Sequence, residues 1–114
     1  MRRFASLRRR ADFARMRQRG RRLATPNFTV FAAPAYGADE RPVVGFSIAK
    51  TVGKAVVRNT LRRRMAAILH DALTGRRLRL LLIARPGAAS LAFPELRVEL
   101  ERAVERSEGA LRPA

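Results

Sequence analysis

The sequence predicts an α/β (α+β) two-layer sandwich, in which helices pack on a small mixed β-sheet. Segments with the two-residue period of strands are interspersed along the chain with segments of helical period, which is the pattern of that class. The length of 114 residues suits one compact domain, which we expect to span residues 1–114. Apolar residues make up 47% of the chain, an ordinary share for a folded protein.

The first half of the chain predicts one helix and two strands. Residues 4–18 carry Phe13 and Met16 three positions apart, which favours a short helix ended by Gly20. Residues 27–33 (NFTVFAA) are typical of a strand, and residues 34–42 of a loop.

Residues 43–49 alternate as a strand that has two unequal faces. One face carries Val44, Phe46 and Ile48, and the other carries Val43, Gly45, Ser47 and Ala49. A face with so little bulk is either covered closely by a helix or left open as a shallow groove.

The second half predicts a helix, a strand and a last helix. Residues 55–73 have a helical apolar stripe that we expect to face the core, formed by Val57, Leu61, Met65, Ile68 and Ala72. Residues 78–85 are typical of a buried strand that ends in a turn at residues 85–87. Residues 93–107 form a helix opened by Pro94 and closed by Gly109, with a buried stripe of Leu96, Leu100 and Val104. Its outer glutamates and arginines are expected to be solvated.

The charge of the chain points to a polyanionic partner. Lys and Arg number 25 against nine Asp and Glu, which gives a formal net charge of +16 and a pI near 12.0. The cations are concentrated in residues 1–22 and 50–79, which suggests one bipartite surface. Self-repulsion on this scale opposes compaction, and nucleic acid is the partner that relieves it best, ahead of an anionic membrane or an acidic protein. The preference for Arg over Lys suits RNA, although an arginine-biased genome explains it equally well.

The composition excludes several classes of site. The chain has no Cys and a single His, so disulfides, thiolate metal sites and histidine metal clusters are not expected. Paired carboxylates at a workable spacing and a Ser-His-Asp set are missing from the pattern, so a stand-alone enzyme is not predicted. The longest apolar stretch is strand-sized and no secretory signal is recognisable, so we expect a cytoplasmic protein with no membrane partner.

Residues 50–64 (KTVGKAVVRNTLRRR) are the most informative segment. They pass from a strand end through a glycine turn into a helix that starts with several cations. A helix N-terminus carries partial positive charge, so Lys54 and Arg58 are unfavourable there unless a phosphate backbone docks beside them. The glycine spacing of a P-loop is missing, and flanking strands argue against a helix-turn-helix.

The pattern Lys50-x-x-Gly53-x-Ala55-x-x-Arg58-Asn59-x-x-Arg62-Arg63 strongly resembles the signature of the bacterial ribonuclease P protein. The resemblance covers nearly the whole chain and includes Asp12-Phe13, Gly20, Phe28, Phe31 and residues 81–85. That family has an α/β sandwich with a left-handed crossover between parallel strands. It assists a catalytic RNA that removes the 5′ leader from precursor tRNA.

The resemblance implies partners and two groups of site residues. The partners are the catalytic RNA and precursor tRNA, with no DNA; the protein alone binds no cofactor, and Mg²⁺ acts in the holoenzyme. We expect RNA to be contacted by Lys50, Lys54, Arg58, Asn59, Arg62, Arg63, Arg64, Arg9 and Arg10. A cleft for the single-stranded leader is expected from Phe13, Arg17, Phe28, Phe31, Gly45, Ser47 and Ala49.

Some points remain open on sequence alone. Phe13 and Phe31 can stack on leader bases or pack in the core. The chain has Thr60 where the family commonly has a basic residue, with Arg64 as a candidate substitute, and Arg17 where many members have an aromatic. Rival functions are a structural RNA binder of the ribosomal-protein type, a regulatory DNA-binding domain and a cationic protein of the membrane surface.

Overall fold

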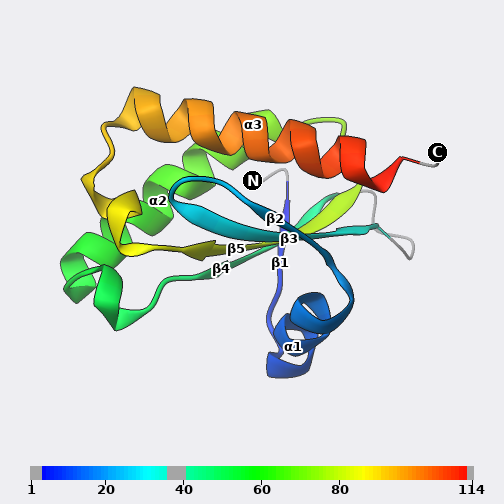
Figure 1. Ribbon diagram of the computed structural model, residues 1–114, viewed down its shortest axis with the longest axis horizontal. Helices are drawn as coiled ribbons and strands as arrows, with labels where there is room; N and C mark the ends of the chain where they lie inside the picture. The colour runs from blue at the N-terminus through cyan, green and yellow to red at the C-terminus, as the bar shows by residue number, and fades with distance from the viewer. Residues whose placement is uncertain (1–3, 36–40, 113–114) are drawn as a thin grey trace.

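The computed structural model describes residues 4–35 and 41–112. The described chain forms a five-stranded sheet with three α-helices (Figure 1). In chain order the elements are β1 (Ala5–Ser6), α1 (Arg10–Arg19), β2 (Arg21–Ala24), β3 (Phe28–Pro34), β4 (Val43–Ser47), η1 (Lys50–Val52), α2 (Ala55–Ala72), β5 (Leu78–Ala84), η2 (Pro86–Ser90) and α3 (Phe93–Leu111), where η marks a 3₁₀ helix.

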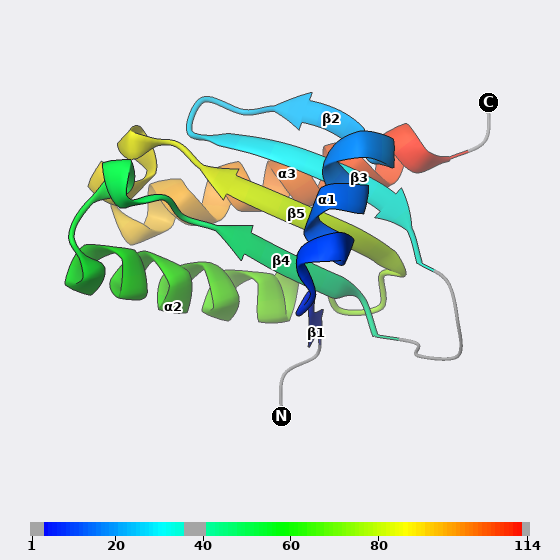
Figure 2. The same cartoon turned by 90° about the horizontal axis from the view of Figure 1, so that it is seen from below.

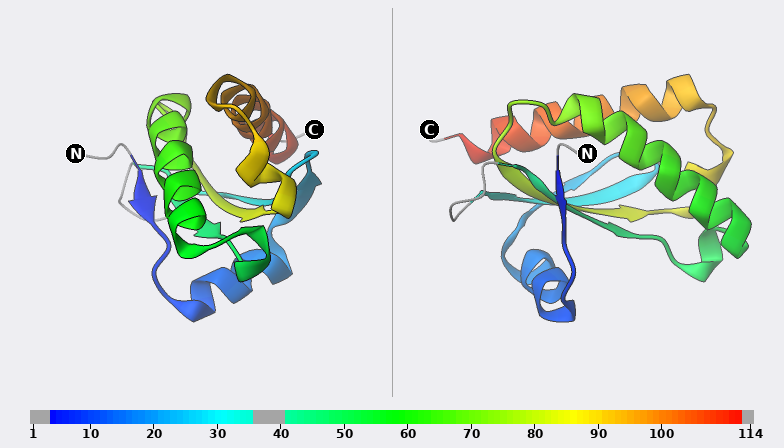
Figure 3. Two further views of the ribbon diagram at one scale, coloured as in Figure 1. Left: turned by 90° about the vertical axis from the view of Figure 1, so that its left-hand side faces the viewer. Right: turned by 180° about the vertical axis from the view of Figure 1, so that it is seen from behind.

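The sheet is mixed, as the sequence predicts. Its strand order is β1-β4-β5-β3-β2. β4 runs parallel to β1 and β5, whereas β3 runs antiparallel to β5 and β2. α2 and α3 cover one face of the sheet, and α1 crosses the opposite face (Figures 1 and 3). The α/β sandwich is therefore confirmed, with α1 as a small addition on its second face.

The connection from β4 through α2 to β5 is left-handed. β4 and β5 are adjacent and parallel, and α2 lies on the side of the sheet away from α1. Seen from the α1 side with both strands pointing up, β5 lies to the right of β4 and α2 lies behind (Figure 2). Parallel strands are joined in the right-handed sense in about 98% of cases, so this crossover is a rare feature. It confirms the expectation from the family resemblance.

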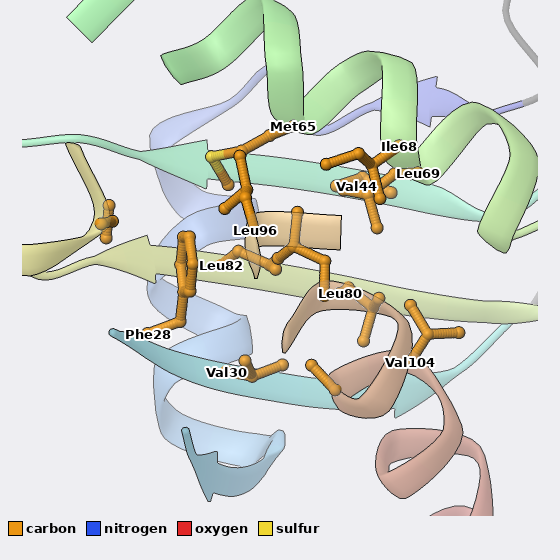
Figure 4. Close-up of a cluster of buried hydrophobic side chains, with 14 of the residues drawn as sticks. Phe28, Val30, Val44, Met65, Ile68, Leu69, Leu80, Leu82, Leu96 and Val104 are labelled. Atoms are coloured by element: carbon orange, nitrogen blue, oxygen red, sulfur yellow. The ribbon is translucent and has the colours of Figure 1, made fainter. Parts of the chain in front are cut away.

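The main core lies between the sheet and the α2–α3 layer (Figure 4). The alternation of β4 is confirmed, because Val44 and Ile48 are buried and Phe46 packs against the cluster. The stripe of α3 is confirmed as well, and Ala103 and Ser107 extend it.

The predicted stripe of α2 is confirmed at Leu61, Met65 and Ile68 but is wrong at Val57. Val57 is 39% exposed, whereas Leu69 and Leu73 are fully buried. The reason is the position of the helix, since the first turn of α2 extends past the ends of β4 and β5 (Figure 2).

Two strands were not predicted from the sequence. The N-terminal segment expected as one helix from residue 4 instead forms β1, and α1 begins only at Arg10. β2 follows α1 almost directly and pairs with β3 as a hairpin. α3 also runs through Gly109 and ends at Leu111, four residues beyond the expected end.

Candidate RNA-binding surfaces

The first surface is the arginine face of α2, formed by Arg58, Asn59, Arg62 and Arg63. The Nη1 of Arg62 donates to the Oδ1 of Asn59 at 3.3 Å, so the two side chains are held together as a pair. Arg63 makes a long 3.5 Å contact with the hydroxyl of Thr60. In residues 4–35 and 41–112, no carboxylate lies within ion-pairing distance of these arginines.

Arg58 differs from its neighbours because it is half-buried. Its Nε atom is buried and has no hydrogen-bond partner within the described residues. An unsatisfied buried donor on a charged group is costly, and an anion close to the guanidinium offsets part of that cost. Arg58 and Arg62 are one turn apart, so a single phosphate backbone can contact both.

The start of α2 adds backbone donors to the same surface. Lys54 occupies the N-cap position without any side-chain cap, and the first turn contains no acidic residue. Lys50 lies in η1 and, like Lys54, is exposed. The uncapped N–H groups and the helix dipole favour an anion at this point. Arg64 is also exposed, but it lies around the helix toward η2 and α3.

The second surface is the open sheet face, the part of the sheet beside α1 that carries Thr29, Phe31, Ser47 and Ile83. These four side chains are half-buried. A small second apolar cluster joins α1 to the sheet at this place: Met16, Ala33 and Leu81 are buried in it, and Leu7, Phe13, Phe31 and Ile83 are partly buried. Phe31 and Ile83 therefore belong to the cluster as well as to the open sheet face.

The surroundings of Gly45 show which part of the small-residue face of β4 is covered. A Cβ atom at Gly45 would lie 2.6 Å from the Cδ1 of Leu7 and 3.0 Å from the Cε1 of Phe13. This part of the small-residue face is therefore closely covered. One strand period further on, Ser47 is half-buried, and Ala49 beyond the strand end is exposed. The face is covered at Gly45 and open from Ser47 onward.

Phe13 and Phe31 are each partly packed and partly exposed. Both rings are half-buried and pack in the second cluster, yet each keeps an exposed part. The chain turn after α1 passes close over Phe31, since a Cβ atom at Gly20 would lie 3.1 Å from the Cβ of Phe31. Arg17 is exposed one turn after Phe13 and so lies on the same side of α1.

Phe28 is not part of the open sheet face, so its assignment to the leader cleft is wrong. Its exposure is 0%, and it points into the main core between β5 and the helices (Figure 4). Residues three apart on a strand point to opposite faces, so Phe28 and Phe31 cannot line one cleft.

Arg9 and Arg10 are exposed at the start of α1. Arg9 lines a hollow of about 280 Å³ together with Arg15 and Arg79. A second hollow of about 330 Å³ shares Arg15 and Arg79 and adds Arg19. These three additional arginines could not be predicted as a group from the sequence, because only the fold brings Arg79 of β5 beside α1.

Neither a membrane-spanning helix nor a metal-binding group of side chains is present in the part of the chain that the structure describes. No helix in 4–35 and 41–112 is long and apolar enough to cross a membrane. Within the same ranges, no three His, Asp or Glu side chains are grouped closely enough to hold a metal ion.

Comparison with known proteins decides the family. The family model for Ribonuclease P matches residues 1–108. The chain belongs to the ribonuclease P protein family. It is thus a protein subunit of the ribonuclease P endoribonuclease, which removes the 5′ leader from precursor tRNA.

Members of the ribonuclease P protein family are similar in sequence to this chain over most of its length. The ribonuclease P protein component of Acidothermus cellulolyticus is 37% identical over 102 residues, which cover 88% of this chain and 85% of that protein. The component of Erythrobacter litoralis is 38% identical over 106 residues, with coverage of 90% and 85%.

Solved structures show the same fold. An RNase P protein mutant from Staphylococcus aureus, described as having defective mRNA degradation activity, superposes with a TM-score of 0.82 at 22% identity, covering 90% of this chain and 87% of that chain. The Thermotoga maritima RNase P protein gives a TM-score of 0.78 at 22% identity, with coverage of 89% and 96%.

Proposed function

We propose that the chain, as one RNA-binding domain over residues 1–114, binds two RNAs at once. The arginine face of α2, with Lys50, Lys54 and Arg64 beside it, holds the catalytic RNA. The open sheet face and α1 hold the single-stranded leader of precursor tRNA. The observation that carries the proposal is the row of guanidinium groups on α2 that no described carboxylate neutralises.

The arrangement of the elements supports simultaneous binding. α2 runs beside β4 on one face of the sheet, and α1 crosses the other face (Figure 2). The catalytic RNA can therefore contact α2 without covering the open sheet face. Phe13 and Phe31 offer ring surface to unstacked bases, and Arg17 offers charge to the leader backbone.

The phosphodiester hydrolysis is assigned to the catalytic RNA with bound Mg²⁺. The described residues do not fit a resident metal site, because no three suitable donors are gathered in them. The chain's own contribution is to neutralise phosphates of the folded RNA and to increase the affinity for substrates that carry a leader.

Cleavage of precursor tRNA by the catalytic RNA at low magnesium tests this proposal. We expect the protein to increase kcat/KM for precursor tRNA strongly, because its cations replace part of the charge neutralisation that the metal provides. Affinity should rise for precursor tRNA and change little for mature tRNA. A protein of the ribosomal type would stabilise the RNA without that distinction between the two substrates.

A further inference from the structure

An apolar notch lies beside the arginine face, where α2, η2 and the start of α3 meet. It has a volume of about 240 Å³ and is lined mostly by aliphatic side chains, among them Val56, Leu61, Ala89 and Leu91. Val56 is 76% exposed, the highest exposure among the large apolar residues that the structure describes. Water contact on this much aliphatic surface is unfavourable, so a partner that covers it gains free energy.

The surroundings of the notch are cationic. Arg64 contributes to its lining, and among its lining residues there is no acid. At 100° per residue, Val56 falls between Arg63 and Arg64 around the axis of α2. The notch is therefore continuous with the arginine face and is bordered by positive charge.

We propose that this notch binds an unstacked nucleobase of the catalytic RNA. The inference rests on the proposed function, in which the arginine face holds the same RNA. An apolar floor with a cationic border matches a nucleotide, whose base is an apolar plane and whose phosphate is an anion. The volume is below the range of about 300–1,000 Å³ for drug-sized ligands and suits a single ring system. A protein segment would need acidic groups to match the same border.

A valine-to-serine exchange tests the apolar contact without a change of charge. Val56→Ser should weaken binding of the catalytic RNA by roughly three- to tenfold, because apolar surface under the base is lost. Val98→Ser is the matched control, since Val98 is also exposed on a helix, at 45%, but lies beside Glu95 and Glu99. We expect no change of affinity for that variant. Circular dichroism of both free variants should show an intact helix signal.

A thiol cross-link identifies the occupant. The chain has no cysteine, so Val56→Cys provides a single attachment point for a short photoreactive group in the reconstituted complex. We expect a cross-link at one unpaired position of the catalytic RNA, and none from Val98→Cys. Scattered or missing cross-links, together with unchanged affinity of Val56→Ser, would overturn the inference. If Arg62→Ala also left the affinity unchanged, the proposed function itself would fail, which separates the two outcomes.

Discussion

Phe31 lies both in the packed second cluster and on the face where we propose that the leader binds. It lies on β3 opposite Leu81 of β5 and Arg22 of β2, so it is held between two neighbouring strands and not at the edge of the sheet. The ring packs in the second cluster but remains partly exposed. The sequence could predict that one of the two phenylalanines of this strand faces the core, but only the packing of α1 and the α2–α3 layer shows which one.

A change that keeps apolar volume and removes the ring separates the two roles of Phe31. Phe31→Leu should lower the affinity for precursor tRNA by about 1–3 kcal/mol, the range for one base–aromatic stack. Affinity for mature tRNA should not change. The free energy of unfolding should fall by less than about 1.5 kcal/mol, because the side chain stays apolar. The measurement is the pair of affinities in the reconstituted complex and a urea titration of the free variant.

Phe28→Leu is the control for this experiment. Phe28 is fully buried in the main core, so its variant should lose stability without any change in the ratio of precursor to mature affinity. If Phe31→Leu behaved like Phe28→Leu, the exposed part of Phe31 would have no part in leader binding.

The arginine face is tested by removing its two exposed guanidinium groups. Arg62→Ala with Arg63→Ala should weaken binding of the catalytic RNA roughly tenfold, since each loses a charge-assisted contact with phosphate. The melting temperature should stay the same, because both side chains are exposed. Arg97→Ala with Arg102→Ala removes the same charge from α3 and should affect RNA binding much less. Equal losses for the two double variants would mean that only total charge matters.

At the scale of elements, the turn between β2 and β3 is attached to α3 by Glu99. Its carboxylate accepts hydrogen bonds from the Thr25 hydroxyl at 2.6 Å, the Asn27 backbone N–H at 2.7 Å and the Asn27 side-chain amide at 2.8 Å. Arg85 donates to the Thr25 carbonyl from the other side. The expectation that the outer glutamates of α3 are merely solvated is therefore wrong for Glu99.

Removing this carboxylate should loosen the hairpin. Glu99→Ala is expected to lower the free energy of unfolding by about 2–4 kcal/mol, since three hydrogen bonds to a charged acceptor are lost at once. Glu101→Ala, at an exposed position of the same helix, should stay within about 0.5 kcal/mol of the parent chain. Urea unfolding of both variants measures the difference. A similar small change in both would show that the turn is held by β-sheet pairing alone.

The elements that could be predicted from the sequence are those whose apolar residues recur with a regular helix or strand spacing. β3, β4, α2, β5 and α3 bury apolar side chains at regular spacing, so their existence is visible in the chain. β1 has only two residues and depends on its parallel partner β4, which is far away in sequence. β2 begins with two exposed arginines and lies at the edge of the sheet, so it has no alternating apolar pattern. Such strands form because they pair with a neighbouring strand, and this pairing leaves no recognisable pattern in the local sequence.

At the scale of the whole molecule, charge is divided between faces. Five of the nine acidic residues lie on α3, whereas residues 1–22 and 50–79 together carry slightly more than the whole net positive charge. Within the described residues, the fold places most of the first block on and around α1 and most of the second on and around α2, on opposite faces of the sheet (Figures 1 and 3). Arg79 of the second block is the exception, since it lies beside Arg15 on the α1 face. The sequence predicted the two basic blocks correctly, but it could not show that a sheet separates them. One surface for each RNA follows more naturally from this arrangement than a single bipartite surface.

This division predicts how binding depends on salt. The logarithm of the affinity for the catalytic RNA should fall linearly with the logarithm of salt concentration, because each phosphate contact releases condensed counterions. Arg62→Ala with Arg63→Ala should make the slope shallower by roughly 0.7–0.9 for each contact removed. Val56→Ser should weaken binding with the slope unchanged, since an apolar contact releases no counterion. Titrations of the three proteins over the same salt range make the comparison.

A flat dependence in the parent chain would contradict the electrostatic basis of binding. A shallower slope in Val56→Ser would mean that the variant disturbs the neighbouring arginines, so the slope separates the base contact from the phosphate contacts beside it.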